Sequence, residues 1–176
     1  GTTALKQHRE KLLEKRAQLD ALINNGDKSI EHTERKANMT DKEKFEGFKQ
    51  KLIDDNEEKY GKEIQKKYGE NAVSSSNAKV KNMTEEQYAE VQKLEEQLFT
   101  NLKAAMKSGD PAGELAQKAA DYHKQWLCFY WDQYSKEAHA GLAEMYVADE
   151  RFTAYYDKVH PGATKLLRDA ILIYIK

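Results

Sequence analysis

The sequence predicts an all-α protein. Its 176 residues include only two prolines and nine glycines, and Lys, Glu, Ala and Leu, which favour helix, are abundant. No segment alternates apolar with polar residues as a half-buried strand does. Apolar residues recur instead at the three- and four-residue intervals that place them on one face of a helix. The length allows one substantial core, or one core with a helical appendage.

Residues 1–38 are predicted to form a coiled-coil dimerisation helix and a connector. Leu5, Leu12 and Leu19 lie seven residues apart, Ile23 extends their stripe, and charged residues fill the other faces. A helix of this kind is marginal when isolated because nucleation is costly, so we expect it to pair with its copy in a homodimer. The alternative is an amphipathic helix packed on its own domain.

Residues 39–80 are predicted to form a charged helical lid and a linker. Thr40 and Glu43 have the spacing of a capping box, which predicts a helix start. The apolar side chains are few, and the lid residues are Phe45, Phe48, Tyr60 and Tyr68. Because so little apolar surface is present, the helix is expected to become ordered when a ligand supplies more. An ordinary solvated surface helix is the alternative. The polar run at 71–79 predicts a linker, with a domain boundary near it.

Residues 81–176 are predicted to form the ligand-binding core. Thr84 with Gln87 begins a long helix that ends at Gly109. Asp110 and Pro111 are expected to begin the next helix, over 111–131, which becomes apolar on nearly all sides. Three further helix starts are predicted at Ser135, Asp149 and Pro161.

Aromatic residues are concentrated in this core, which is the main functional signal. Eleven of the seventeen lie between residues 122 and 174: Tyr122, Trp126, Phe129, Tyr130, Trp131, Tyr134, Tyr146, Phe152, Tyr155, Tyr156 and Tyr174. A single aromatic residue at helical spacing is more often plain core. Together they indicate a pocket for flat, multi-ring ligands. The predicted ligand-binding residues are Trp126, Tyr130, Tyr134, His139, Tyr146, Phe152 and Tyr156.

Signatures of catalysis are missing from the sequence, so we expect a binding protein and no enzyme. The five histidines are scattered without metal-binding spacing, and no glycine-rich phosphate loop occurs, so no metal and no cofactor are predicted. Cys128, the one cysteine, lies among apolar residues and is interpreted as a small core residue. His139 is either a hydrogen-bonded structural imidazole or a group that orients a ligand carbonyl or amide.

Charge and hydropathy restrict the partners. Twenty-nine basic and thirty acidic residues leave a formal charge of -1, so no basic excess exists to bind nucleic acid. The apolar runs are shorter than the roughly 20 residues of a membrane-spanning helix, and no signal peptide opens the chain. These observations predict a cytoplasmic protein that binds neither DNA nor membrane through this region.

The string HAGLAEMYVADERFTAYYDKVHPGATKLLRDAI, residues 139–171, resembles the antibiotic-recognition domain of TipA-type regulators in the MerR family. A weaker similarity extends back to about residue 40. The resemblance implies a globin-like helical domain that senses antibiotics or drug-like molecules and activates transcription. It also implies that DNA is bound by a winged helix-turn-helix ahead of the coiled coil, in a longer parent protein.

One position departs from the family's pattern. Thiopeptide-capturing members carry a cysteine just before a Ser-x-Glu-x-His element, where this chain has Tyr134 followed by Ser135, Glu137 and His139. Cys128 lies six residues earlier and is not given the nucleophile's role. The resemblance therefore implies noncovalent binding of a multi-ring or peptide-like compound. Two alternatives are a haem sensor with His123 or His139 as axial ligand, and a protein-binding helical adaptor without a small-molecule ligand.

Overall fold

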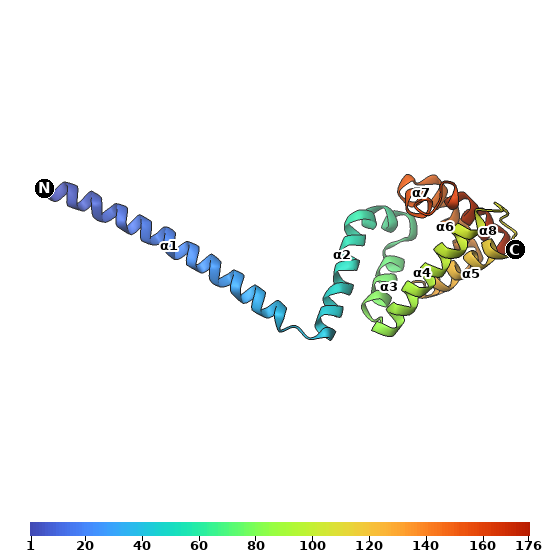
Figure 1. Ribbon diagram of the computed structural model, residues 1–176, viewed down its shortest axis with the longest axis horizontal. Helices are drawn as coiled ribbons and strands as arrows, with labels where there is room; N and C mark the ends of the chain where they lie inside the picture. The colour runs from blue at the N-terminus through green and yellow to red at the C-terminus, as the bar shows by residue number, and fades with distance from the viewer. The chain divides into compact units, whose positions relative to one another are not determined.

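A computed structural model describes residues 1–176, except for the side chain of Tyr68. The described residues form eight α-helices and no strand, which confirms the predicted all-α class (Figure 1). The chain divides into two compact units, residues 1–48 and residues 49–176. This division differs from the boundary that the polar run at 71–79 suggested. None of the described helices combines the length and apolar character needed to cross a bilayer.

The first unit contains helix α1, Thr2–Ala37, and the beginning of helix α2, Asp41–Tyr68. No residue of α1 is buried, all of them being described. The predicted capping box at the start of α2 is present: the Glu43 N–H donates to Thr40 Oγ1 over 3.2 Å, and the Thr40 N–H donates to Glu43 Oε2 over 3.2 Å. Local sequence therefore sets the start of α2 as expected.

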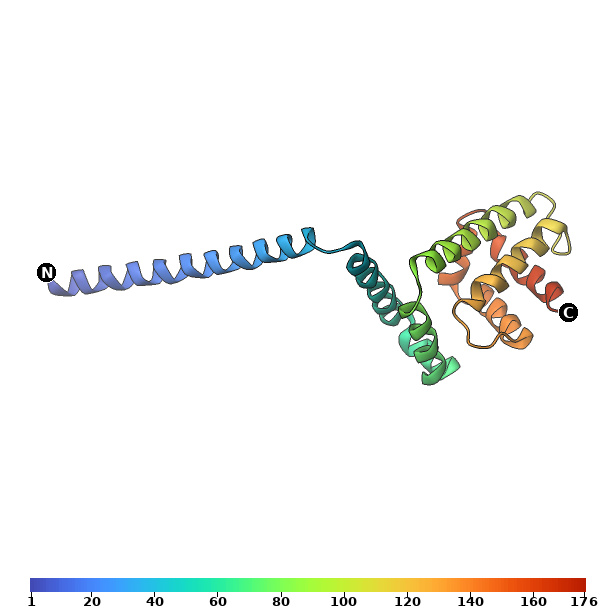
Figure 2. The ribbon, with the colours of Figure 1, turned by 90° about the horizontal axis from the view of Figure 1, so that it is seen from below.

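Residues predicted as a linker are helical instead, within helix α3, Glu70–Lys81. Helix α2 ends at Tyr68, the following Gly69 has a φ of 84° that favours glycine, and α3 returns beside α2 (Figures 1 and 2). The Asn77 amide donates to Glu57 Oε1 over 2.8 Å. The buried Lys49 ammonium donates to the carbonyls of Lys81 and Met83 over 2.7 and 2.9 Å. These tertiary contacts satisfy the end of a helix whose serines and asparagines have low helix propensity.

Five helices form the main core: α4 (Glu85–Ala105), α5 (Glu114–Cys128), α6 (Lys136–Ala148), α7 (Glu150–Asp157) and α8 (Ala163–Tyr174). Helix α4 packs on α5, and α8 packs against both α5 and α6 (Figure 2). Leu102, Leu167 and Ile171 are fully buried between them. Burial of such side chains supplies most of the stability of an amphipathic helix, because propensity alone is weak.

Three of the predicted helix starts in the core are confirmed by side-chain caps. Thr84 and Gln87 form a complete capping box. Ser135 accepts a hydrogen bond from the N–H of Ala138, and Asp149 accepts one from the N–H of Arg151. The observed caps match the predicted helix starts because each cap depends only on residues three or fewer apart in sequence.

Two helix starts were predicted too early. Helix α5 begins at Glu114 with Gly113 as its N-cap, because the Asp110 carboxylate accepts from the Ala112 N–H and closes a turn ahead of the helix. Helix α8 begins two residues after Pro161, following Gly162 with a φ of 88°. In both cases the residues that predicted the helix start form a turn, and the helix begins after that turn.

The end of α5 also differs from the prediction. The helix stops at Cys128, and the thiol residue is exposed, which corrects its assignment to the core. Trp131 is half-buried and its carbonyl accepts a hydrogen bond from Lys79 Nζ over 2.5 Å. The Trp131 carbonyl therefore bonds to α3 outside the helix, and the apolar run does not enter the core as a whole.

Candidate functional site

Most of the predicted ligand-binding residues lie together between α5, α6 and α7. Tyr146 of α6 contacts Phe152 and Tyr156 of α7, with ring centroids 5.5 and 4.8 Å apart. On α5 and the turn after it, Trp126 and Tyr130 have centroids 4.9 Å apart. The sequence thus identified an aromatic cluster that the fold assembles from three segments.

A chain of hydrogen bonds runs through the middle of this cluster. Tyr134 Oη lies 2.8 Å from His139 Nδ1, and His139 Nε2 lies 2.8 Å from His123 Nδ1. His123 Nε2 then lies 3.0 Å from the hydroxyl oxygen of Tyr146. Both imidazoles are fully buried. The chain therefore joins a half-buried tyrosine to a buried one through two stacked histidines.

Burial keeps both imidazoles neutral. Desolvation lowers the pKa of His123 well below 6.5, and the neighbouring His139 lowers it further. Desolvation, with the nearby Lys124 ammonium, lowers the pKa of His139 to about 4. A neutral imidazole has one N–H donor and one acceptor nitrogen, so the two rings must donate in the same direction along the chain.

Two donor orders satisfy the chain, and they differ at both ends. In the first, Tyr134 donates to His139, His139 to His123, and His123 to Tyr146. In the second, every donor is reversed and the Tyr134 hydroxyl is free to donate elsewhere. A ligand acceptor bound to Tyr134 would select the second order, because one O–H cannot serve both partners fully. A new hydrogen bond at the Tyr134 hydroxyl can therefore reverse which group donates at the Tyr146 hydroxyl.

The same geometry bears on the alternative of a haem sensor. All four ring nitrogens of His123 and His139 are in hydrogen bonds, so neither ring presents a free lone pair to iron. Across the described residues, no three His, Cys, Asp or Glu side chains are grouped to hold a metal ion. The histidines serve here as hydrogen-bonding groups.

Exposure separates the predicted ligand-binding residues into two sets. Trp126, Tyr130, Tyr134 and Phe152 are half-buried. His139 is fully buried, and Tyr146 and Tyr156 are each 4% exposed. In this conformation the second set lies beneath the first and supports it.

The predicted lid contacts the aromatic cluster through Tyr60. Tyr60 of α2 stacks on Phe152 at a centroid distance of 5.4 Å, and the Arg151 guanidinium lies 4.9 Å from the Tyr60 ring centroid. Arg151 also pairs with Glu63 of α2. Phe45 and Phe48 belong to the other compact unit, Phe48 being 42% exposed, and the side chain of Tyr68 lies outside the described part.

A second set of contacts joins α3 to the turn after α5, and the sequence analysis missed it. The Lys79 ammonium bonds to the Trp131 carbonyl and lies 3.5 Å from Asp132 Oδ1. Ser75 donates to the Asp132 carboxylate. Because the partners are more than fifty residues apart, no local pattern signals them; only the opposite charges of Lys79 and Asp132 could have suggested a pair.

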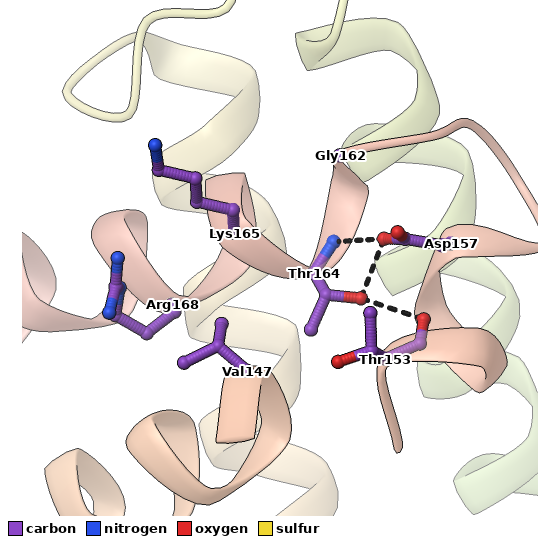
Figure 3. Close-up of a pocket in the computed structure, with 7 residues that line it drawn as sticks. All are labelled: Val147, Thr153, Asp157, Gly162, Thr164, Lys165 and Arg168. Atoms are coloured by element: carbon purple, nitrogen blue, oxygen red, sulfur yellow. Dashed lines mark hydrogen bonds between the residues drawn. The ribbon is translucent and has the colours of Figure 1, made fainter. Parts of the chain in front are cut away.

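A separate pocket of about 260 Å³ lies between the end of α6, α7 and α8 (Figure 3). The N–H and hydroxyl of Thr164 donate to Asp157 Oδ1 over 2.8 and 2.7 Å. Burial opposes ionisation of Asp157, but these bonds outweigh it and the pKa of the carboxyl is lowered. The carboxylate therefore caps the N-terminus of α8, and the pocket is distinct from the aromatic cluster.

Comparison with known proteins relates this architecture to a family of regulators. A family model described as the TipAS antibiotic-recognition domain matches residues 60–174. The HTH-type transcriptional activator TipA of Streptomyces coelicolor is 36% identical over 137 residues, 77% of this chain and 53% of that protein. The activator mta of Bacillus subtilis is 25% identical over 171 residues, 97% of this chain and 66% of that protein. The chain thus spans only part of the length of these relatives.

A solved structure extends the similarity to the fold. TipAS of Streptomyces lividans, determined in complex with nosiheptide as part of a thiopeptide antibiotic resistance system, matches with a TM-score of 0.58 and 33% identity. The match covers 78% of this chain and 95% of that chain. The family model matches more than half of the chain, the curated relatives and the solved structure agree with it, and this chain belongs to the family of TipAS antibiotic-recognition domains.

Proposed function

We propose that this chain is the effector-binding part of a MerR-type transcription activator, and that it binds a multi-ring or peptide-like antibiotic noncovalently. The observation that carries the proposal is its 33% identity to TipAS, a protein solved with the thiopeptide nosiheptide bound. The relatives TipA and mta are transcriptional activators. Binding to a regulator needs no chemical step, so the proposed role is recognition without catalysis.

The half-buried aromatic residues are the proposed contact surface. Trp126, Tyr130, Tyr134 and Phe152 combine large apolar area with polar tips, which suits flat heteroaromatic rings. His139, Tyr146 and Tyr156 act from beneath by holding the rings and the Tyr134 hydroxyl in place. An acceptor on the ligand would then set the donor order of the histidine chain.

The α2–α3 hairpin is the proposed lid. It is joined to the core by the Tyr60–Phe152 stack and by exposed ion pairs such as Arg151–Glu63. Exposed ion pairs contribute about 0–1 kcal/mol each, so these pairs oppose opening only weakly. Hydrogen exchange across 49–80 is expected to slow when nosiheptide binds. Equal exchange with and without bound nosiheptide would remove the lid from the proposal.

The parent protein supplies the remaining parts of the proposed activator. Helix α1 pairs with its copy in a homodimer, and a DNA-binding domain elsewhere in a longer chain reads the operator. Such a regulator works in the cytoplasm, where it meets DNA. Lid closure alters the helix that leads toward α1, which is how occupancy would reach the DNA-binding domain.

A titration with nosiheptide tests binding directly. The two tryptophans, Trp126 and Trp131, belong to the proposed site or adjoin it, so their emission reports on occupancy. We expect a saturable change in emission and a rise in melting temperature, because a ligand that binds only the native state stabilises it. If nosiheptide and a panel of aromatic antibiotics change neither signal, the adaptor alternative is favoured.

A hydroxyl deletion and a matched control sharpen the test. Tyr134→Phe removes the group at the open end of the histidine chain and is expected to weaken nosiheptide binding about five- to tenfold. Tyr122→Phe removes a hydroxyl from a half-buried ring outside the proposed contact surface and should leave affinity unchanged. Equal affinities of the two variants would mean that the ligand does not contact Tyr134.

Exposure of Cys128 makes the noncovalent part of the proposal testable. After incubation with nosiheptide, mass spectrometry under denaturing conditions is expected to show the unmodified chain. A mass increase equal to nosiheptide that disappears in Cys128→Ser would show covalent capture and overturn this part.

A further inference from the structure

A half-buried carboxylate lies beside three aromatic rings at the α4–α7 contact. The Tyr155 hydroxyl donates to the Glu95 carboxylate. The rings of Phe99, Tyr155 and Tyr156 contact one another, with centroid distances of 5.5 Å for Phe99–Tyr155, 5.7 Å for Phe99–Tyr156 and 5.1 Å for Tyr155–Tyr156. We call Glu95, Phe99, Tyr155 and Tyr156 the Glu95 cluster. It presents negative charge and aromatic faces to the same region.

An ammonium group already occupies the ring faces of this cluster. Lys158 Nζ lies 4.4 Å from the Phe99 centroid and 4.1 Å from the Tyr155 centroid. Both distances are within the range in which a cation is attracted by an aromatic ring. Lys158 is an exposed side chain and Tyr155 is 41% exposed, so solvent reaches the position of the ammonium. The ring faces therefore hold an ammonium group, and the exposed Lys158 side chain is able to move from them into water.

The Lys158 ammonium does not fully offset the effect of burial on the pKa of Glu95. Burial raises the pKa of the Glu95 carboxyl by more than the nearby Lys158 lowers it, and Glu96 raises it further. The Glu95 carboxylate also affects the pKa of Tyr130 in the aromatic cluster. Burial raises the pKa of Tyr130 to about 12, and the charges of Tyr88 and Glu95 contribute. Tyr156, which contacts Phe99 on one side and Tyr146 on the other, joins the Glu95 cluster to the predicted ligand-binding residues.

We propose that the Glu95 cluster is a subsite for the cationic group of a lipophilic organic ammonium or phosphonium ligand, which takes the place of the Lys158 side chain. The inference rests on the proposed function, because it names a ligand class for the same binding region. Displaced from the rings, the lysine ammonium is solvated, while the ligand's cation gains Glu95 and the ring faces. A delocalised cation loses less hydration than an ammonium when it enters such a site.

The cluster suits an organic cation better than a metal ion. Ca²⁺ and Mg²⁺ take six or more oxygen ligands, whereas the cluster offers one carboxylate and otherwise aromatic surface. A single carboxylate balances a monovalent cation, and the rings supply apolar contact with its substituents. The recognition chemistry therefore selects for low charge density and for aromatic or alkyl groups around the charge.

Tetraphenylphosphonium is the probe, and triphenylphosphine oxide, which keeps three of its rings without the charge, is its neutral comparison. We expect saturable binding of tetraphenylphosphonium followed by tryptophan emission, at least about tenfold tighter than that of the oxide. Glu95→Gln is expected to weaken phosphonium binding about tenfold, while Glu96→Gln, which removes the same charge from an exposed neighbour, should have little effect. Lys158→Gln is expected to tighten binding about threefold because no ammonium has to be displaced.

Nosiheptide is titrated against the same variants, so that failure of the subsite and failure of antibiotic recognition are distinguishable. Loss of nosiheptide binding by the unaltered chain would count against the proposed function. Normal nosiheptide binding with no phosphonium binding, with equal affinity for phosphonium and oxide, or with unchanged phosphonium affinity in both Glu95→Gln and Lys158→Gln would overturn the subsite. Far-UV circular dichroism confirms that each variant is folded, and the gain expected for Lys158→Gln cannot arise from unfolding.

Discussion

Helices α1 and α8 carry similar apolar residues but use them in opposite ways. Helix α1 has 36 residues, none of them buried, and its Leu5 and Leu19 are 70% and 59% exposed. Helix α8 has 12 residues, six of which are buried, and Leu167 and Ile171 are fully buried. The comparison shows that an apolar stripe predicts a helix equally well whether or not the chain itself covers that stripe. Stability follows the covered surface, since burial and not helix propensity supplies it.

The largest difference between the two helices is expected from truncating one leucine in each. Leu167→Ala leaves a cavity in a fully buried position and should lower the free energy of unfolding of the core by about 3 kcal/mol. Leu12→Ala, at a position 53% exposed, should lower it by less than about 0.5 kcal/mol. Urea unfolding followed by tryptophan emission measures the core, since both tryptophans lie in the second unit. Similar losses in the two variants would break the comparison.

The next largest effect is a loss of core stability in mild acid. The pKa of His139 is about 4 in the folded chain and near 6.5 when unfolded, so between these values the unfolded state binds more protons. The contribution is therefore complete above about pH 6.5 and is lost as the pH falls toward 4. Between pH 7 and pH 5, His139 alone should lower the free energy of unfolding by about 2 kcal/mol.

Variants of one buried and one exposed histidine separate this effect from general acid sensitivity. In His139→Gln the dependence between pH 7 and pH 5 is expected to be shallower, whereas His160→Gln, an exposed position, should retain it. Urea midpoints at the two pH values provide the measurement. An unchanged slope in His139→Gln would show that this imidazole is not the source of the pH dependence.

Two capping boxes of the same design allow a smaller test of the same comparison. Thr84→Ala removes the cap of α4 and should destabilise the core by about 1 kcal/mol. Thr40→Ala removes the equivalent cap of α2 in the other compact unit, and the tryptophan-detected transition should change by less than half as much. Equal shifts would mean that the two units unfold as one.

The smallest effect on core stability is expected from the proposed dimerisation surface. Replacing Leu5, Leu12 and Leu19 together with Ala should leave the core transition within about 0.5 kcal/mol of the original. Sedimentation should nevertheless show the mass falling from that of a dimer to that of a monomer. A dimer that survives this triple substitution would show that α1 is not its interface.

Sequence reasoning succeeded best where the signal was local. The caps at Thr84, Ser135 and Asp149 depend on a few adjacent residues, and each lies where it was predicted. The helical segment at 70–81 was missed because it depends on Lys49, about thirty residues earlier, which binds the carbonyls at its end. From its polar composition alone, that segment was predicted to be a linker.

The candidate site shows the same limit. The density of aromatic residues indicated a binding region, and the fold places most of the named residues together. Spacing in the sequence did not reveal that His123 and His139 bond to each other, because they lie on different helices whose relative rotation no local pattern encodes. Cys128 was placed in the core on the apolar character of its neighbours, yet the helix ends there and the side chain is exposed.

By itself, the sequence determined the helical class, most helix starts, the family resemblance and the heptad spacing of α1, because each depends on residue type and on short-range spacing. Only the tertiary structure decided which apolar faces are covered, that the Tyr134–Tyr146 hydrogen-bond chain passes through two histidines, and that Glu95 accepts from Tyr155, whose ring lies beneath the Lys158 ammonium. Those features depend on how helices distant in sequence pack together, and packing is settled by the fit of many side chains at once.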